Sequence, residues 1–209
     1  MPTHPTRSVF IAVAPLLPAL AACLLGGCSL FPGRGESSLV VKSTADDASL
    51  AATFKTAAYL WTDNNTADIY LSDLPVEVLA DPAADLRSRT GQLIHIHLFL
   101  VPIAGRTPID PTACNFTIRH VVLAGGQAGM YSGGGFLLPS GEPGGDWFTA
   151  SLMDATVRLA RSDPGFTDRL GVSTLSGAIA AARNDAVARA MAGHLESIIN
   201  SMPESARRR

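Results

Sequence analysis

Two histidines lie inside one of the most apolar segments of the chain, and imidazole is the side chain that most often binds metal ions. His95 and His97 are two residues apart within residues 93–101. On a β-strand this spacing points both rings to the same face. His120, on a neighbouring strand, would complete a three-nitrogen zinc site with an open fourth position. His194 is a second candidate for the third ligand. The pattern therefore offers zinc as an alternative cofactor.

Strand parity argues against this zinc site. Residues 93–101 lie between Gly91 and Pro102 and have the length of a long strand. One face is aliphatic and includes Ile94 and Ile96, so we expect that face to point into the main core and the histidines to point away from it. His120 shares a face with apolar neighbours, which predicts that it points into the core. We therefore favour histidines held by hydrogen bonds, with no metal, no cofactor and no catalytic residue.

The spacing of His95, His97 and His120 is similar to that of the zinc ligands of the α-type carbonic anhydrases. The resemblance covers these three positions alone. Residues 93–94 and 118–119 differ from the flanks in that family, and no threonine or glutamate is identifiable as support for the ligands. The resemblance implies a zinc-dependent enzyme as an alternative function.

The N-terminus has the organisation of a secretory signal. Arg7 precedes an apolar stretch over residues 9–20, and Leu25-Gly26-Gly27-Cys28 follows. The order of an aliphatic residue, two small residues and cysteine resembles the bacterial lipobox. The resemblance implies cleavage before Cys28 and attachment of lipid to its thiol. Leu20-Ala21-Ala22-Cys23 is a second match, so Cys23 is the alternative lipidation site.

The lipobox resemblance implies a location in the cell envelope and the membrane as a partner. We expect a signal peptide over residues 1–27 and a lipidated tether over residues 28–38, which contains glycine, proline and serine. Ser29 is not aspartate, and in this class of lipoproteins that favours the outer membrane over the inner one if the host has an outer membrane. The membrane is then a partner through the lipid. A formal net charge of −2 indicates no general attraction to nucleic acid.

The rest of the chain reads as one β-rich domain over residues 39–203, followed by a disordered basic tail over residues 204–209. About seven apolar segments of strand length are separated by turn residues. We expect an antiparallel β-sandwich of immunoglobulin-like or transthyretin-like kind. The glycines around Gly133 suggest a flexible hairpin tip. From about residue 176 to 202 the apolar period becomes helical, which predicts an amphipathic helix that covers the sheet face with Leu93, Phe99 and Val101.

These features together predict a lipoprotein of the bacterial cell envelope that acts as a non-catalytic binding or structural module. One alternative is a zinc-binding protein or zinc-dependent enzyme that uses His95 and His97. Another is a subunit of an envelope assembly that docks on a protein partner through the C-terminal helix.

Overall fold

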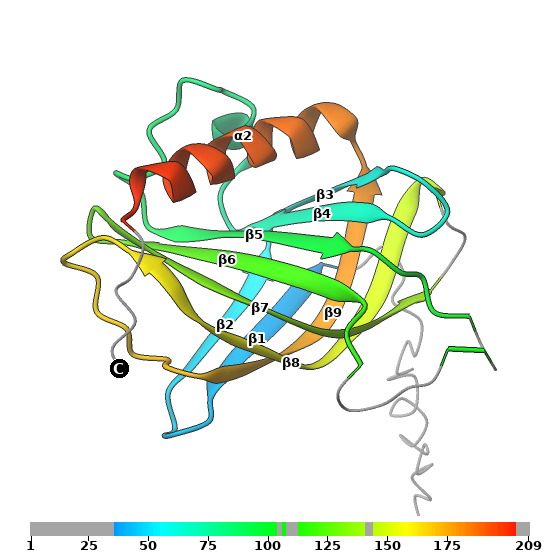
Figure 1. Ribbon diagram of the computed structural model, residues 1–209. Coiled ribbons are helices and arrows are strands. Elements are labelled where there is room, and N and C mark those ends of the chain that lie inside the picture. Colours follow the sequence, from blue (N-terminus) through cyan, green and yellow to red (C-terminus); the bar gives the residue numbers. More distant parts are fainter. Residues whose placement is uncertain (1–35, 104–105, 108–112, 141–143, 204–209) are drawn as a thin grey trace, which may run out of the picture. The chain divides into compact units, whose positions relative to one another are not determined.

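The computed structural model describes residues 36–103, 106–107, 113–140 and 144–203, and these contain nine strands and two helices (Figure 1). All of them belong to the unit Pro32–Arg209. In chain order the elements are β1 (Ser37–Ser43), β2 (Ser49–Phe54), β3 (Thr56–Trp61), β4 (Ala67–Ser72), α1 (Val76–Leu79), β5 (Gly91–Leu98), β6 (Phe116–Ala124), β7 (Gln127–Ser140), β8 (Trp147–Ser162), β9 (Ser173–Arg183) and α2 (Asp185–Ser201).

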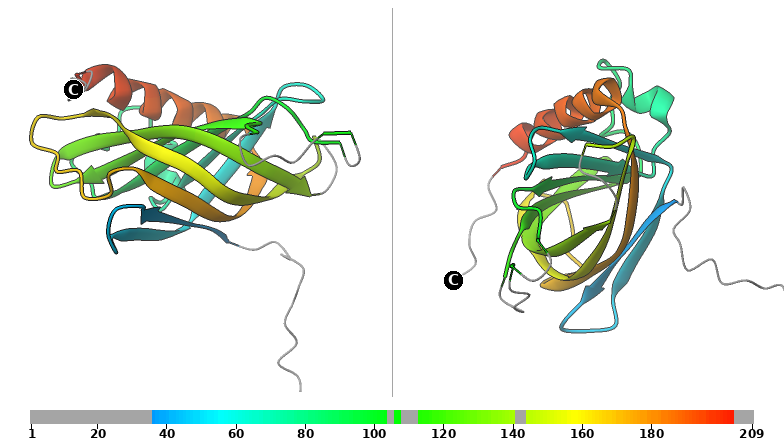
Figure 2. Two further views of the ribbon diagram at one scale, coloured as in Figure 1. Left: turned by 60° about the horizontal axis from the view of Figure 1, so that its bottom comes forward. Right: turned by 90° about the vertical axis from the view of Figure 1, so that its right-hand side faces the viewer.

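The strands form a closed barrel, and the predicted sandwich is wrong. Seven strands follow one another around the barrel in the order β3-β4-β5-β6-β7-β8-β9. The ring closes where β9 pairs in parallel with β3, through Ala58–Ala182 and Tyr59–Arg183. The β1–β2 hairpin is attached to the first half of β9, outside the ring. Figure 2 shows the closed ring in its right-hand view.

Glycines in β7 explain why the sheet closes. The segment predicted to be a flexible hairpin tip is part of this 14-residue strand. A Cβ at Gly133 would collide with the carbonyl oxygen of Thr156 on β8, and a Cβ at Gly135 would lie 2.7 Å from the Cα of Ala155. The β7–β8 register also shifts between Gly134 and Phe136. Glycines and register shifts of this kind bend strands and allow close backbone approach, and a flat sandwich sheet does not need them.

Aromatic and aliphatic side chains fill the interior of the barrel. Tyr59, Phe116 and Tyr131 are among its largest fully buried members. The predicted direction of residues 93–101 is confirmed for β5, because Ile94 and Ile96 point into this core. The strand ends at Leu98, earlier than expected.

Helix α2 covers a second apolar cluster on the outer surface of the barrel. Met191 and Leu195 of the helix pack with Leu93 of β5 and Val121 of β6. The prediction that the helix covers Leu93 is confirmed, but it is wrong for Phe99, which is exposed, and for Val101, which packs against the other apolar cluster. Neither described helix is long and apolar enough to cross a membrane.

The predicted start of the helix near residue 176 is wrong. Residues 173–183 form β9, and the helix begins after Asn184, whose side-chain oxygen accepts a hydrogen bond from the backbone N–H of Val187. The alanine-rich segment has helical propensity, but it pairs with β1, β3 and β8, and these pairings override local preference.

The predicted signal peptide (1–27), both lipidation candidates (Cys23 and Cys28) and the basic tail (204–209) lie outside the described residues. The first strand begins at Ser37 and thus takes in the last two residues of the predicted tether.

Candidate functional site

The antiparallel pairing of β4 and β5 brings a carboxylate next to the two histidines of β5. In the register of this pair, Asp68 lies opposite His97 and Tyr70 lies opposite His95. The interior-facing residues alternate with these four, so all four side chains project from the outer surface of the barrel.

One carboxylate oxygen joins the two imidazoles. Oδ1 of Asp68 accepts hydrogen bonds from Nε2 of His95 and from Nδ1 of His97, both at 2.8 Å. The three side chains are only partly buried, and His97 is the most open, with 38% of its side chain exposed. Burial disfavours the charge on Asp68, but hydrogen bonds from both histidines outweigh burial and lower the pKa of this carboxyl.

Neighbouring side chains fix the orientation of the site. The ring of Tyr70 stacks on His95, with centroids 4.6 Å apart and planes within 7°. Burial, with a smaller contribution from the charge of Asp68, raises the pKa of Tyr70 to about 12, so its hydroxyl is protonated at neutral pH. On the next strand Arg119 lies opposite His95 and forms a 2.5 Å ion pair with Glu196 of α2. Tyr70 of β4 therefore packs on the ring of His95, and the Arg119–Glu196 pair joins the neighbouring strand β6 to α2.

The geometry is suited to a metal ion. Asp68, His95 and His97 each offer one ligand atom, and these atoms lie within 4.8 Å of one another. Zinc binds imidazole nitrogen and carboxylate oxygen at about 2.0–2.2 Å, which separates two ligands of a tetrahedral site by about 3.3 Å. The 2.8 Å separations of the carboxylate oxygen from each nitrogen would have to widen by only about half an ångström. A fourth position would face solvent on the side of His97.

The structure does not bring His120 to this site. His120 points into the barrel, where its Nε2 lies 2.9 Å from Oε1 of Gln92. Burial lowers its pKa to about 4, so the ring is neutral at neutral pH, and the amide oxygen of Gln92 accepts its N–H. The prediction that His120 and the His95–His97 pair face opposite sides of the sheet is confirmed. The three-histidine set of the carbonic anhydrase resemblance therefore does not form.

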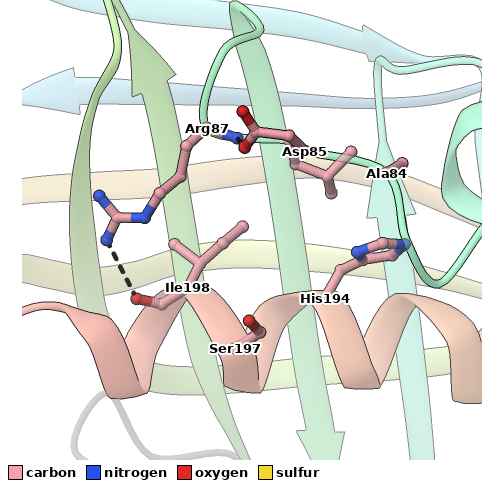
Figure 3. A pocket seen from close by; sticks show the side chains of 7 residues that line it. Ala84, Asp85, Arg87, His194, Ser197 and Ile198 are labelled. Carbon is pink, nitrogen blue, oxygen red and sulfur yellow. Dashed lines mark hydrogen bonds between the residues drawn. The ribbon is translucent and has the colours of Figure 1, made fainter.

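His194 also lies elsewhere. It is buried on α2 and lines a cavity of about 90 Å³ together with Ala84, Asp85, Leu86, Arg87, Ser197 and Ile198. Figure 3 shows the guanidinium of Arg87 turned away from His194 and toward the carbonyl oxygen of Ile198. The charged groups of this cavity do not converge on His194.

Sequence reasoning missed Asp68, which is the residue that joins the two histidines. Alternation along residues 67–72 separates Asp68 and Tyr70 from the interior residues, so the face of Asp68 could have been inferred. Its partners could not, because eighteen residues separate β4 from β5 and a connection of this length does not fix the register. No known protein-family model, curated protein or solved structure matches the chain.

Proposed function

We propose that this protein is a lipid-anchored lipoprotein of the bacterial envelope that binds zinc at Asp68, His95 and His97 as a non-catalytic binding module. The lipobox-like sequence before Cys28 supports the anchor and the envelope location, with the outer membrane favoured by Ser29. The convergence of two imidazole nitrogens on one carboxylate oxygen carries the proposal of metal binding.

The ligand set favours a borderline transition metal over calcium or magnesium. Calcium and magnesium prefer sites made entirely of oxygen, whereas imidazole suits zinc, copper, iron and nickel. Two histidines and one carboxylate also hold iron in a class of oxygenases. Here the site lies on the outer surface of the barrel, and the interior is filled by side chains such as Tyr59 and Phe116. A site on the open surface fits metal binding, or a metal that bridges two molecules, better than it fits a reaction that must be enclosed by the protein.

The alternative of docking through α2 receives less support from the packing. The apolar residues of the helix, including Met191 and Leu195, are buried against the barrel. A protein partner would have to use the polar face of the helix.

Metal content is the direct test. The full chain, expressed without a histidine tag and extracted in detergent, should hold about one zinc per chain by elemental analysis, with less iron, copper and nickel. His97→Asn and Asp68→Ala should each weaken zinc binding by at least about tenfold, because each removes one of three ligands. His194→Asn is the matched control, because it replaces a histidine outside the site and should leave the zinc content unchanged.

Thermal melting gives a second measurement on the same samples. Free zinc at one hundred times its Kd should stabilise the protein by about 2.7 kcal/mol, which corresponds to a rise in Tm of about 5–11 °C for a protein of this size. The rise should disappear with chelator and in His97→Asn. A metal-free protein whose Tm does not change with zinc or with chelator would refute the proposal. Zinc binding by His97→Asn with the affinity of the unmodified chain would also refute it.

A further inference from the structure

Exposed apolar side chains gather at one end of the barrel. Eight large hydrophobic side chains are exposed among the described residues, and four of them lie in the segment after β5 or at the start of β8. Phe99, Leu100 and Ile103 follow β5, and Trp147 begins β8. Between 41 and 56% of each is exposed. Single exposed hydrophobic residues are common on soluble proteins, but a group of this kind at one end of a domain marks an interaction surface.

Strand pairing places the segment after β5 and the start of β8 at the same end of the barrel. Leu98, the last residue of β5, lies opposite Ala67, and Ala67 lies opposite Trp61 at the end of β3. Trp147 lies opposite Ala182, which pairs with Ala58 of the same strand β3. The hydroxyl of Tyr59 also donates to the carbonyl oxygen of Gly145, in the loop before Trp147. The segment after β5 and the start of β8 therefore both lie at the end of the barrel toward which β3 runs.

The described chain begins in the half of the barrel nearer this end. β1 runs antiparallel to β9, and the hydroxyl of Ser37, its first residue, donates to the carbonyl oxygen of Ala180 near the end of β9 (Figures 1 and 2). Cys28, the favoured lipidation site, precedes Ser37 by nine residues. A fully extended chain of that length spans at most about 30 Å. A lipid on Cys28 would therefore keep Ser37, and with it this half of the barrel, within about 30 Å of the bilayer.

We propose that Phe99, Leu100, Ile103 and Trp147 insert into the interfacial region of the membrane that holds the lipid anchor. This inference rests on the proposed anchor and is independent of the zinc site. Tryptophan is enriched at membrane interfaces, because its ring is apolar and its N–H can bond to water and headgroups.

Charges at this end do not select anionic lipid. Among the described residues at this end, the exposed cations Arg106 and Arg183 are outnumbered by the exposed acids Asp63, Asp146 and Asp185. Apolar insertion is therefore the expected source of the contact, and neutral phosphatidylcholine vesicles are the appropriate probe.

Tryptophan fluorescence tests this contact in the full lipidated chain. The sequence has two tryptophans, so Trp61→Phe leaves Trp147 as the only one. In vesicles that contain lipids brominated near the top of the acyl chains, Trp147 emission should lose intensity and shift to shorter wavelength. The control carries Trp61→Phe, Trp147→Phe and Val172→Trp. Val172 is 51% exposed beside the first residue of β9, at the opposite end of the barrel, and a tryptophan there should not be quenched.

Flotation of the vesicles separates this inference from the anchor on which it rests. Flotation with a quenched Trp147 and no quenching in the Val172→Trp control supports the inference, and Phe99→Ser with Ile103→Ser should then reduce the quenching. Flotation with an unquenched Trp147 would overturn the inference and leave the anchor standing. The same result together with a dimer in detergent would assign the surface to a second copy of the chain. Failure of every variant to float would overturn the anchor and the inference with it.

Discussion

Leu195 shows whether helix α2 is part of the folded core. Its side chain is 1% exposed and packs in the outer cluster with residues of the barrel. Leu195→Ala removes three carbons. Their burial stabilises the fold by about 2.4 kcal/mol, at about 0.8 kcal/mol per buried carbon, and the variant loses this contribution. The cavity left behind adds to this cost, so we expect a loss of about 2–5 kcal/mol in the free energy of unfolding. For a chain of 209 residues this lowers Tm by about 5–20 °C.

Thermal melting followed by circular dichroism, with the neighbouring Glu196→Ala as control, measures this loss. Glu196 is exposed, and its ion pair with Arg119 is a surface contact, so its removal should cost less than about 1 kcal/mol. Equal melting temperatures for Leu195→Ala and Glu196→Ala would refute the packing of the helix on the barrel. The helix would then be available for a partner.

Two further changes test the outer site and the closure of the barrel. Because the folded pKa of Asp68 lies below its ordinary value of 3.8, the ionised carboxylate stabilises the fold above that pH, and this contribution is lost as the pH falls through the folded pKa. The stability difference between the unmodified chain and Asp68→Asn, measured by urea unfolding from pH 6 to pH 2.5, should stay below about 1 kcal/mol. It should shrink as the pH falls, and a constant difference would contradict the assigned cause. Gly133→Ala should destabilise by at least about 1–3 kcal/mol, because its Cβ meets the carbonyl of Thr156. Gly193→Ala on the open face of α2 should stabilise by up to about 1 kcal/mol, and equal melting temperatures for the two variants would contradict the close approach of β7 and β8.

The directions of side chains on β5 could be predicted from the sequence. Alternation is a local property, so the aliphatic residues Ile94 and Ile96 identify the inner face without knowledge of the neighbours. The same rule placed His95 and His97 outside and His120 inside, as the structure has them. Because the outer face of β5 also carries apolar residues, the sequence predicted a cover over that face. Helix α2 supplies this cover over Leu93.

The closed barrel and the place of Asp68 in the candidate site could not be predicted, because both depend on contacts between distant segments. A sandwich and a barrel share short alternating strands, and the pairing of β9 with β3 that distinguishes the barrel joins segments far apart in the sequence. Asp68 reaches His97 only in one register of β4 and β5. The alanines of β9 favoured a helix locally, and the pairing with β1 and β8 decided otherwise.

The position of β9 also constrains when the barrel can form during synthesis. This strand contacts β1, β3 and β8 and supplies the only parallel pairing in the ring that the described residues form, through two residue pairs. Its residues, 173–183, are among the last strand residues to be made. Because the chain is synthesised from its N-terminus, strands β3 to β8 can pair first as an open sheet with free edges. They cannot close into a ring before β9 is made. Until β9 arrives, the half-made domain exposes apolar surface and unpaired backbone that chaperones recognise.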